Sequence, residues 1–171
     1  MNVYINNSDS SASIIKGFFV GYQLVAYIVG TDTIESNNIL NMDLNDPPSD
    51  VLVSILNHPE IDSSMIITNK DAKYNQLQIH AFNVKSGIRQ GTIVKSSIPP
   101  GSIFNPGVFL TYFLYVDRNV NVLGISKGYS SESDTIVTNV DLKLKEGYNK
   151  VNIKFKILRS NYREFDYFDV D

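Results

Sequence analysis

The chain has 171 residues, a length that fits one domain with a core large enough to fold without disulfides or metals. The net charge of −3 provides no basic field for nucleic acid or an anionic membrane. Because cysteine is absent and only two histidines occur, disulfides, cysteine nucleophiles, thiolate metal sites and a three-histidine metal site within one chain are excluded.

The N-terminal part predicts a polar segment followed by strands. Residues 1–12 are rich in Asn and Ser, which predicts a linker ahead of a single domain over residues 13–171. Residues 13–30 predict the first strands, with a bend or bulge at Gly21. The apolar run over residues 17–30 is too short to cross a bilayer as a helix, so we expect no integral membrane segment.

Residues 31–50 form a polar connection that is rich in carboxylates. Asp43, Asn45, Asp46 and Asp50 carry the oxygen ligands that Ca²⁺ prefers, but their spacing does not match an EF-hand. Ordinary loop and helix-capping roles are therefore favoured, and calcium binding by residues 43–50 stays an open alternative.

One short helix is predicted near residues 50–57. Ser49 is a suitable N-cap, apolar residues follow at helical spacing, and Pro59 ends the pattern. Residues 51–53 also fit a strand. His58 would then interact with the last carbonyl groups of the helix.

From residue 63 onward, strand patterns recur at short spacing with turns rich in Gly, Asn, Asp, Ser and Pro. The expected strands are 65–68, 76–84, 91–97, 108–116, 120–126, 134–145 and 150–158. The C-terminal residues 161–171 predict a closing edge strand, with an acidic tail as the alternative. This order of elements predicts an all-β fold, an antiparallel β-sandwich of the immunoglobulin, transthyretin or jelly-roll kind with one short helix.

The clearest local pattern lies at residues 140–157, where apolar residues alternate with charged or polar ones on both sides of a turn that contains Gly147. A period of two predicts a hairpin with one buried face and one lysine-bearing face, and exposed lysines commonly protect a sheet from aggregation. The expected core comprises Val20, Leu24, Ile79, Leu110, Leu114, Leu142, Leu144, Val151, Ile153 and Phe155.

Candidate ligand-binding residues lie on the predicted strand 76–84, where Gln78, His80 and Phe82 share one face and could contact a sugar or peptide. A half-exposed strand face without function gives the same pattern. Tyr129 is a further candidate, because the loops 98–107 and 127–134 are expected to carry recognition. No metal site or cofactor is predicted.

The chain contains no nucleophile elbow, P-loop, dinucleotide-binding or zinc-protease motif, so we predict no catalytic residues. The alternative is a carbohydrate-active hydrolase that uses a carboxylate pair, for which Asp117 and Glu132 are the candidates. Such a pair requires a defined separation and one carboxyl group that stays protonated.

Residues 113–124 and 141–151 resemble a pattern in β-sandwich domains of Bacteroidetes-type surface lipoproteins. An aromatic strand ends in the acidic-basic pair Asp117-Arg118, and a second strand leads into the turn Glu146-Gly147-Tyr148-Asn149. The resemblance implies export and a lipid-anchored parent protein, and it implies no catalytic residues. We therefore expect a non-enzymatic binding or structural module of an exported or cell-surface protein, with a protein or glycan partner.

Overall fold

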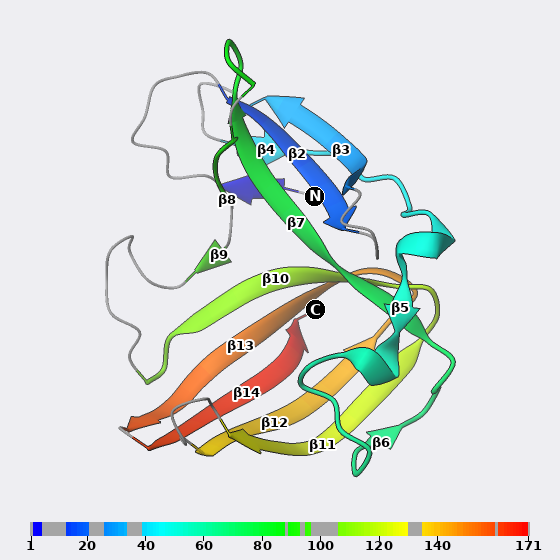
Figure 1. Ribbon diagram of the computed structural model, residues 1–171, viewed down its shortest axis with the longest axis vertical. Coiled ribbons are helices and arrows are strands. Elements are labelled where there is room, and N and C mark those ends of the chain that lie inside the picture. The colour runs from blue at the N-terminus through cyan, green and yellow to red at the C-terminus, as the bar shows by residue number, and fades with distance from the viewer. Residues whose placement is uncertain are drawn as a thin grey trace. The chain divides into compact units, whose positions relative to one another are not determined.

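The computed structural model describes residues 2–4, 13–20, 26–33, 39–87, 89–92, 95–96, 106–129, 135–159 and 161–170 (Figure 1). Contacts between Cα atoms divide the chain into two compact units. Unit 1 comprises Met1–Leu52 and Gln76–Val94, and unit 2 comprises Val53–Asn75 and Lys95–Asp171. The single domain expected over residues 13–171 stays a prediction.

Unit 1 is built around the strands β2 (Ser13–Val20) and β7 (Lys73–Asn83), which pair in antiparallel orientation. The other pairings join β2 with β3 (Ala26–Thr33), β7 with β8 (Arg89–Thr92), and β1 (Asn2–Tyr4) with β4 (Ile39–Asn41). Ile15 of β2 and Ile79 of β7 are buried, as period-two alternation requires of a half-buried sheet.

Two observations bear on the expectations for the N-terminal part. Residues 2–4, inside the predicted linker, form β1 and pair with β4. The irregularity of β2 lies between Gly17 and Phe18, whereas the expected site at Gly21 is outside the described residues.

The long strands of unit 2 lie in the order β10-β13-β14-β12-β11, followed by the short β6. The elements of unit 2 are β5 (Val53–Ser54), β6 (Ile66–Ile67), β9 (Lys95–Ser96), β10 (Phe109–Val116), β11 (Val120–Tyr129), β12 (Thr135–Leu144), β13 (Gly147–Arg159) and β14 (Tyr162–Val170). The all-β prediction is confirmed. The strands form an open mixed sheet in place of the purely antiparallel layers expected, because β14 runs parallel to β12.

The main correction concerns the predicted hairpin at residues 140–157. β14 lies between β12 and β13 and pairs with both, so β12 and β13 are not neighbours. Where β12 and β14 end their pairing, the Lys143 N–H donates to Asp169 Oδ1 at 2.8 Å. The turn differs from the predicted Glu146–Asn149, because β13 already begins at Gly147, which has a φ of 100°. Asn149 Nδ2 donates to the carbonyl groups of Lys145 and Gly147.

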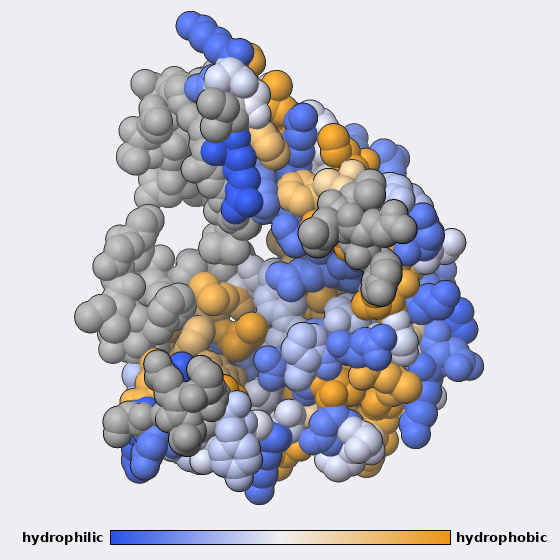
Figure 2. Space-filling model, viewed as in Figure 1, coloured by the Kyte–Doolittle hydropathy of each residue, from blue (hydrophilic) through white to orange (hydrophobic). Residues whose placement is uncertain are grey.

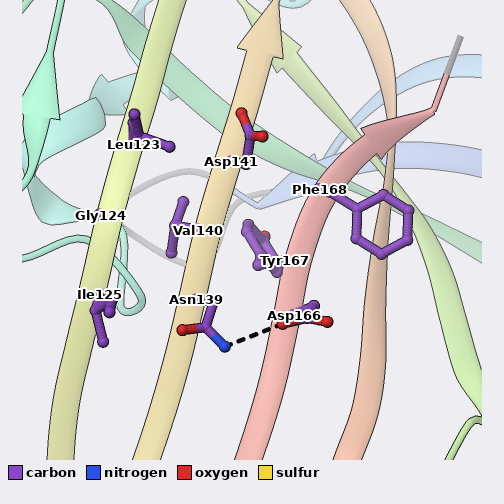
Figure 3. A pocket seen from close by; sticks show the side chains of 9 residues that line it. All are labelled: Leu123, Gly124, Ile125, Asn139, Val140, Asp141, Asp166, Tyr167 and Phe168. Atoms are coloured by element: carbon purple, nitrogen blue, oxygen red, sulfur yellow. Dashed lines mark hydrogen bonds between the residues drawn. The ribbon is translucent and has the colours of Figure 1, made fainter.

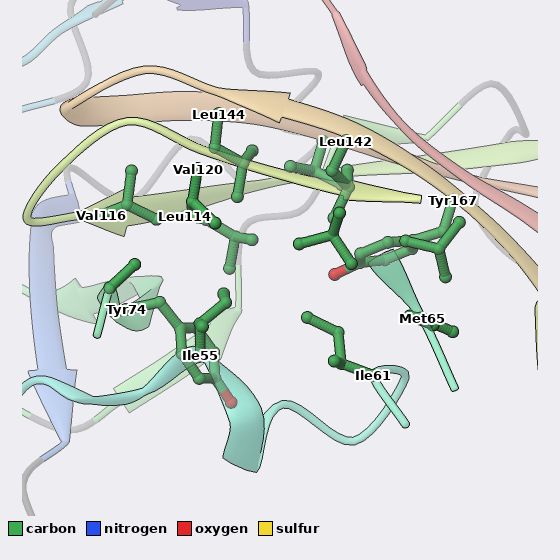
Figure 4. Close-up of a cluster of buried hydrophobic side chains, with 14 residues drawn as sticks. Ile55, Ile61, Met65, Tyr74, Leu114, Val116, Val120, Leu142, Leu144 and Tyr167 are labelled. Carbon is green, nitrogen blue, oxygen red and sulfur yellow. The ribbon is translucent and has the colours of Figure 1, made fainter. Parts of the chain in front are cut away.

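The core of unit 2 lies between the inner face of this sheet and the segment that runs from β5 to the start of β7 (Figure 4). The segment contributes Ile55, Ile61, Met65, Ala72 and Tyr74. The sheet contributes Leu114, Val116, Val120, Val122, Val140, Leu142, Leu144, Val151 and Tyr167.

Of the ten predicted core residues, five are buried: Ile79, Leu114, Leu142, Leu144 and Val151. Leu24 lies outside the described residues, and the other four are half-buried: Val20, Leu110, Ile153 and Phe155. Ile153 packs against the edge of the unit 2 core. The period-two pattern therefore identified the inner face correctly, while the depth of burial along each strand differs.

The short helix predicted near residues 50–57 is divided into two single turns of 3-10 helix, η1 (Ser49–Val51) and η2 (Ile55–Asn57), with β5 between them. Ser54 caps η2 by accepting a hydrogen bond from the Leu56 N–H, whereas Ser49 makes no such cap. Within the described ranges, no helix has the length and hydrophobicity needed to cross a membrane.

Candidate functional site

The outer face of the unit 2 sheet, opposite the core, carries two rows of side chains across β11, β12 and β14. The strand registers align Leu123, Asp141 and Phe168 in one row and Ile125, Asn139 and Asp166 in the next. Between the rows, Gly124, Val140 and Tyr167 form the floor of a pocket of about 390 Å³ (Figure 3). We call this pocket the outer trough.

One end of the outer trough is apolar and open to solvent. Leu123 and Ile125 are 52% and 51% exposed, and Ile66, which pairs with Leu123 from β6, is 67% exposed. In the lower half of Figure 2, apolar areas in orange lie among polar ones in blue. Contiguous exposed apolar side chains mark interaction sites more often than isolated ones do.

The other end of the outer trough is a network of charged and polar groups. Asn139 Nδ2 donates to Glu164 Oε1 at 3.1 Å and to Asp166 Oδ1 at 3.0 Å, and Lys156 Nζ lies 2.9 and 3.3 Å from the same two atoms. The hydrogen bond from Lys156, followed by that from Asn139, lowers the pKa of Glu164. The Glu164 carboxylate is therefore held ionised, which is the opposite of a general acid.

Asp141 lies between the two ends and differs from the other carboxylates. Its side chain is exposed and makes no ion pair or hydrogen bond with another described side chain. A free carboxylate next to exposed Leu123 suits a ligand that combines an apolar part with a hydrogen-bond donor or a positive charge.

Beneath the floor of the trough, on the core side, lies a buried polar network. Tyr167 Oη is 3.0 Å from His58 Nε2, and the Glu60 N–H donates to His58 Nδ1 at 3.1 Å. Because Nδ1 accepts, the neutral imidazole carries its hydrogen on Nε2. Burial lowers the pKa of His58 to about 4, and burial together with Glu60 raises the pKa of Tyr167. This places His58 in the core of unit 2 instead of at the carbonyl groups of a helix end.

The predicted ligand-binding residues Gln78, His80 and Phe82 lie on one face of β7 in unit 1. The rings of His80 and Phe18 pack edge-on with their centres 4.6 Å apart, and Lys16 Nζ lies 5.1 Å from the centre of the Phe82 ring. His80 is only 5% exposed, and burial and the nearby Arg89 lower its pKa. Ligand binding by this face stays a prediction.

Tyr129, the fourth predicted residue, belongs to unit 2, where it ends β11 and is 81% exposed. Of the loops expected to carry recognition, residues 98–105 and 130–134 lie outside the described part of the chain.

Of the alternative catalytic pair, Glu132 lies outside the described residues. Asp117 has a structural environment: it accepts the Lys73 N–H at 2.8 Å and pairs with Arg118 at 3.0 Å. Partial burial acts to raise the pKa of Asp117, but the Lys73 amide and the Arg118 guanidinium outweigh it, so the pKa is lowered.

The carboxylates of residues 43–50 do not gather around a common point. Asp50 accepts a hydrogen bond from the Tyr27 hydroxyl at 3.2 Å, and the Asn45 N–H donates to the Val29 carbonyl. In the part of the chain that the structure describes, no three or more His, Asp or Glu side chains are grouped to hold a metal ion.

Sequence reasoning missed the outer trough because the trough depends on which strands are neighbours. The alternation of β12 places Asp141 on the same face as Lys143 and opposite Leu142, and this signal is present in the sequence. The contribution of Asp166 and Phe168 follows only from the insertion of β14 beside β12. Comparison with known proteins identified no matching family model, no similar curated protein and no similar solved structure.

Proposed function

We propose that this chain is a non-enzymatic binding module of an exported or cell-surface protein, with the outer trough as its binding surface. The observation that carries the proposal is the juxtaposition of exposed Leu123 and Ile125 with the unpaired carboxylate of Asp141 on strands of one sheet. Apolar contact area combined with a few placed polar groups is the usual composition of a ligand site.

The chemistry of the trough supports binding over catalysis. Lys156 and Asn139 already bond to the carboxylates of Glu164 and Asp166, and the lowered pKa of Glu164 disfavours its use as a general acid. The carboxylates of the trough also disfavour a polyanionic partner, which agrees with the net charge of −3 and with a protein or glycan ligand.

Variants of the trough test this proposal on arrays of glycans and peptides. Asp141→Asn removes the charge at constant shape, and Leu123→Ser removes exposed apolar area, so each is expected to weaken binding of the captured ligands about tenfold. Lys145→Gln, in the connection that follows β12 and outside the trough, serves as the matched control and should bind as the native chain does.

Ligands that bind Asp141→Asn and Leu123→Ser as tightly as the native chain would rule out the trough. Turnover of an arrayed glycan by the native chain would favour the hydrolase alternative instead. Fractionation of the native host cells tests the location separately, and a purely cytosolic protein would contradict export.

A further inference from the structure

We propose that β11 binds an extended polypeptide segment by adding it as an antiparallel strand along the open edge that borders the outer trough. This inference rests on the proposed function, since it names the class of partner that unit 2 would bind. It follows from the backbone geometry of β11, from the side chains along its edge, and from the place where the pairing between β6 and β11 stops.

Only the first part of the β11 edge is covered by the described residues. β6 pairs with Val122 and Leu123, and Thr68 exchanges hydrogen bonds with Asn121 through its backbone N–H and its hydroxyl group. The segment just ahead of β6 makes a turn, in which the Asp62 carboxylate accepts hydrogen bonds from the N–H and the hydroxyl of Ser64, each at 2.6 Å, so the pairing with β11 stops at Ile66. Residues 124–129 pair with β12 alone in the described part of the sheet.

The backbone groups that point toward this edge can be identified from the pairing. Along an antiparallel strand, the N–H and C=O groups of one residue point to one neighbour, and those of the next residue point to the other. Because Asn121 bonds toward Thr68, and β11 pairs with β12 without a bulge, Ile125, Lys127 and Tyr129 direct their N–H and C=O groups to the open edge. A strand added opposite these three residues would form six backbone hydrogen bonds.

The same three residues present their side chains on the outer face. Ile125 and Tyr129 are exposed apolar and aromatic groups, and Lys127 between them has no carboxylate within ion-pair distance among the described residues. Cross-strand neighbours of opposite charge stabilise a sheet, as do apolar and aromatic pairs. The complementary segment therefore carries an acidic residue opposite Lys127 and apolar or aromatic residues two positions away on either side.

A second copy of this chain is a poorer occupant of the edge. Two β11 edges related by a two-fold axis and centred on this segment would place Lys127 directly opposite the Lys127 of the second copy, and like charges in that position destabilise a sheet pair. Lysine on an edge strand is a common guard against self-association. The positive charge of Lys127 therefore disfavours an added strand with a basic residue opposite it and favours one with an acidic residue there.

The test uses a blocked, fluorescently labelled peptide, Thr-Phe-Thr-Glu-Thr-Val-Thr, whose Phe, Glu and Val would lie opposite Tyr129, Lys127 and Ile125. We expect the native chain to bind it at least fivefold more tightly than the same peptide with Lys in place of Glu. The variant Lys127→Glu should reverse this preference. N-methylation of the peptide Glu, which removes the hydrogen bond to the Lys127 carbonyl, should weaken binding at least tenfold without any change to the protein.

Equal affinity for the Glu and Lys peptides in both the native chain and Lys127→Glu would overturn strand addition at this edge. So would a sedimentation result in which the native chain dimerises and Lys127→Pro, which lacks the outward N–H, is monomeric. If either result is found while the ligands of the array experiment still bind to the trough, strand addition fails and the proposed function does not. The failure of one proposal is therefore distinguishable from the failure of the other.

Discussion

Lowering the pH from 7 to 4 is expected to reduce the free energy of unfolding by about 3 kcal/mol through His58. Burial lowers the pKa of His58 to about 4 in the folded chain, against about 6.5 for histidine in the unfolded chain. Between these values the unfolded chain binds more protons, so stability is complete above pH 6.5 and falls as the pH decreases toward 4.

The local geometry explains why protonation is unfavourable. A charged imidazole would carry a hydrogen on Nδ1, which would then face the Glu60 N–H, itself a donor. The remaining nitrogen already lies against Tyr167 Oη in the core, where no water can solvate the new charge.

Urea unfolding between pH 4 and 7 measures this effect. The variant His58→Gln should lose most of the pH dependence that the native chain shows in this window. His80→Gln, which alters the only other histidine, should leave most of it in place. An unchanged pH dependence in His58→Gln would show that the imidazole is solvated or protonated in the folded chain.

Gly124→Ala is expected to destabilise the chain by about 1–3 kcal/mol through overpacking. A Cβ atom at Gly124 would come within 2.6 Å of Met65 Cγ and 3.1 Å of Met65 Cα, and Met65 is buried beneath the trough. Avoiding this overlap requires the backbone that leads into β6 to move. That movement would also disturb the pairing between β6 and β11.

Gly128→Ala is the matched control for that variant, because a Cβ atom at Gly128 of the same strand meets nothing within 4 Å. It should be neutral or slightly stabilising, since alanine restricts the unfolded chain more than glycine does. Thermal unfolding of the two variants makes the comparison, and equal melting temperatures would mean that Met65 does not pack against β11.

The sequence was most informative where period-two alternation could be read without knowledge of neighbours. β10 to β13 lie close to their expected positions, and Leu142, Leu144 and Val151 are buried as the alternation predicted. Alternation fixes which side chains share a face, because successive residues of any strand point to opposite sides.

The pattern could not reveal the order of the strands or the buried polar network. The predicted turn Glu146–Asn149 has hairpin chemistry in the sequence, yet β12 and β13 are separated by β14. The His58 network joins residues more than a hundred positions apart, and neither histidine position shows its burial in local composition. The candidate site depends on the strand order, so only its individual residue types could be predicted from the sequence.

The outer trough requires that β14 lies beside β12, between β12 and β13, because Asp166 and Phe168 reach the trough from β14. The most direct measurement is the set of nuclear Overhauser effects between backbone protons of a uniformly labelled sample. The structure predicts cross-strand signals from Asn139 to Asp166 and from Asp166 to Lys154. Signals that join Asp141 directly to Lys154, with none from β12 to β14, would restore the simple hairpin and contradict the trough.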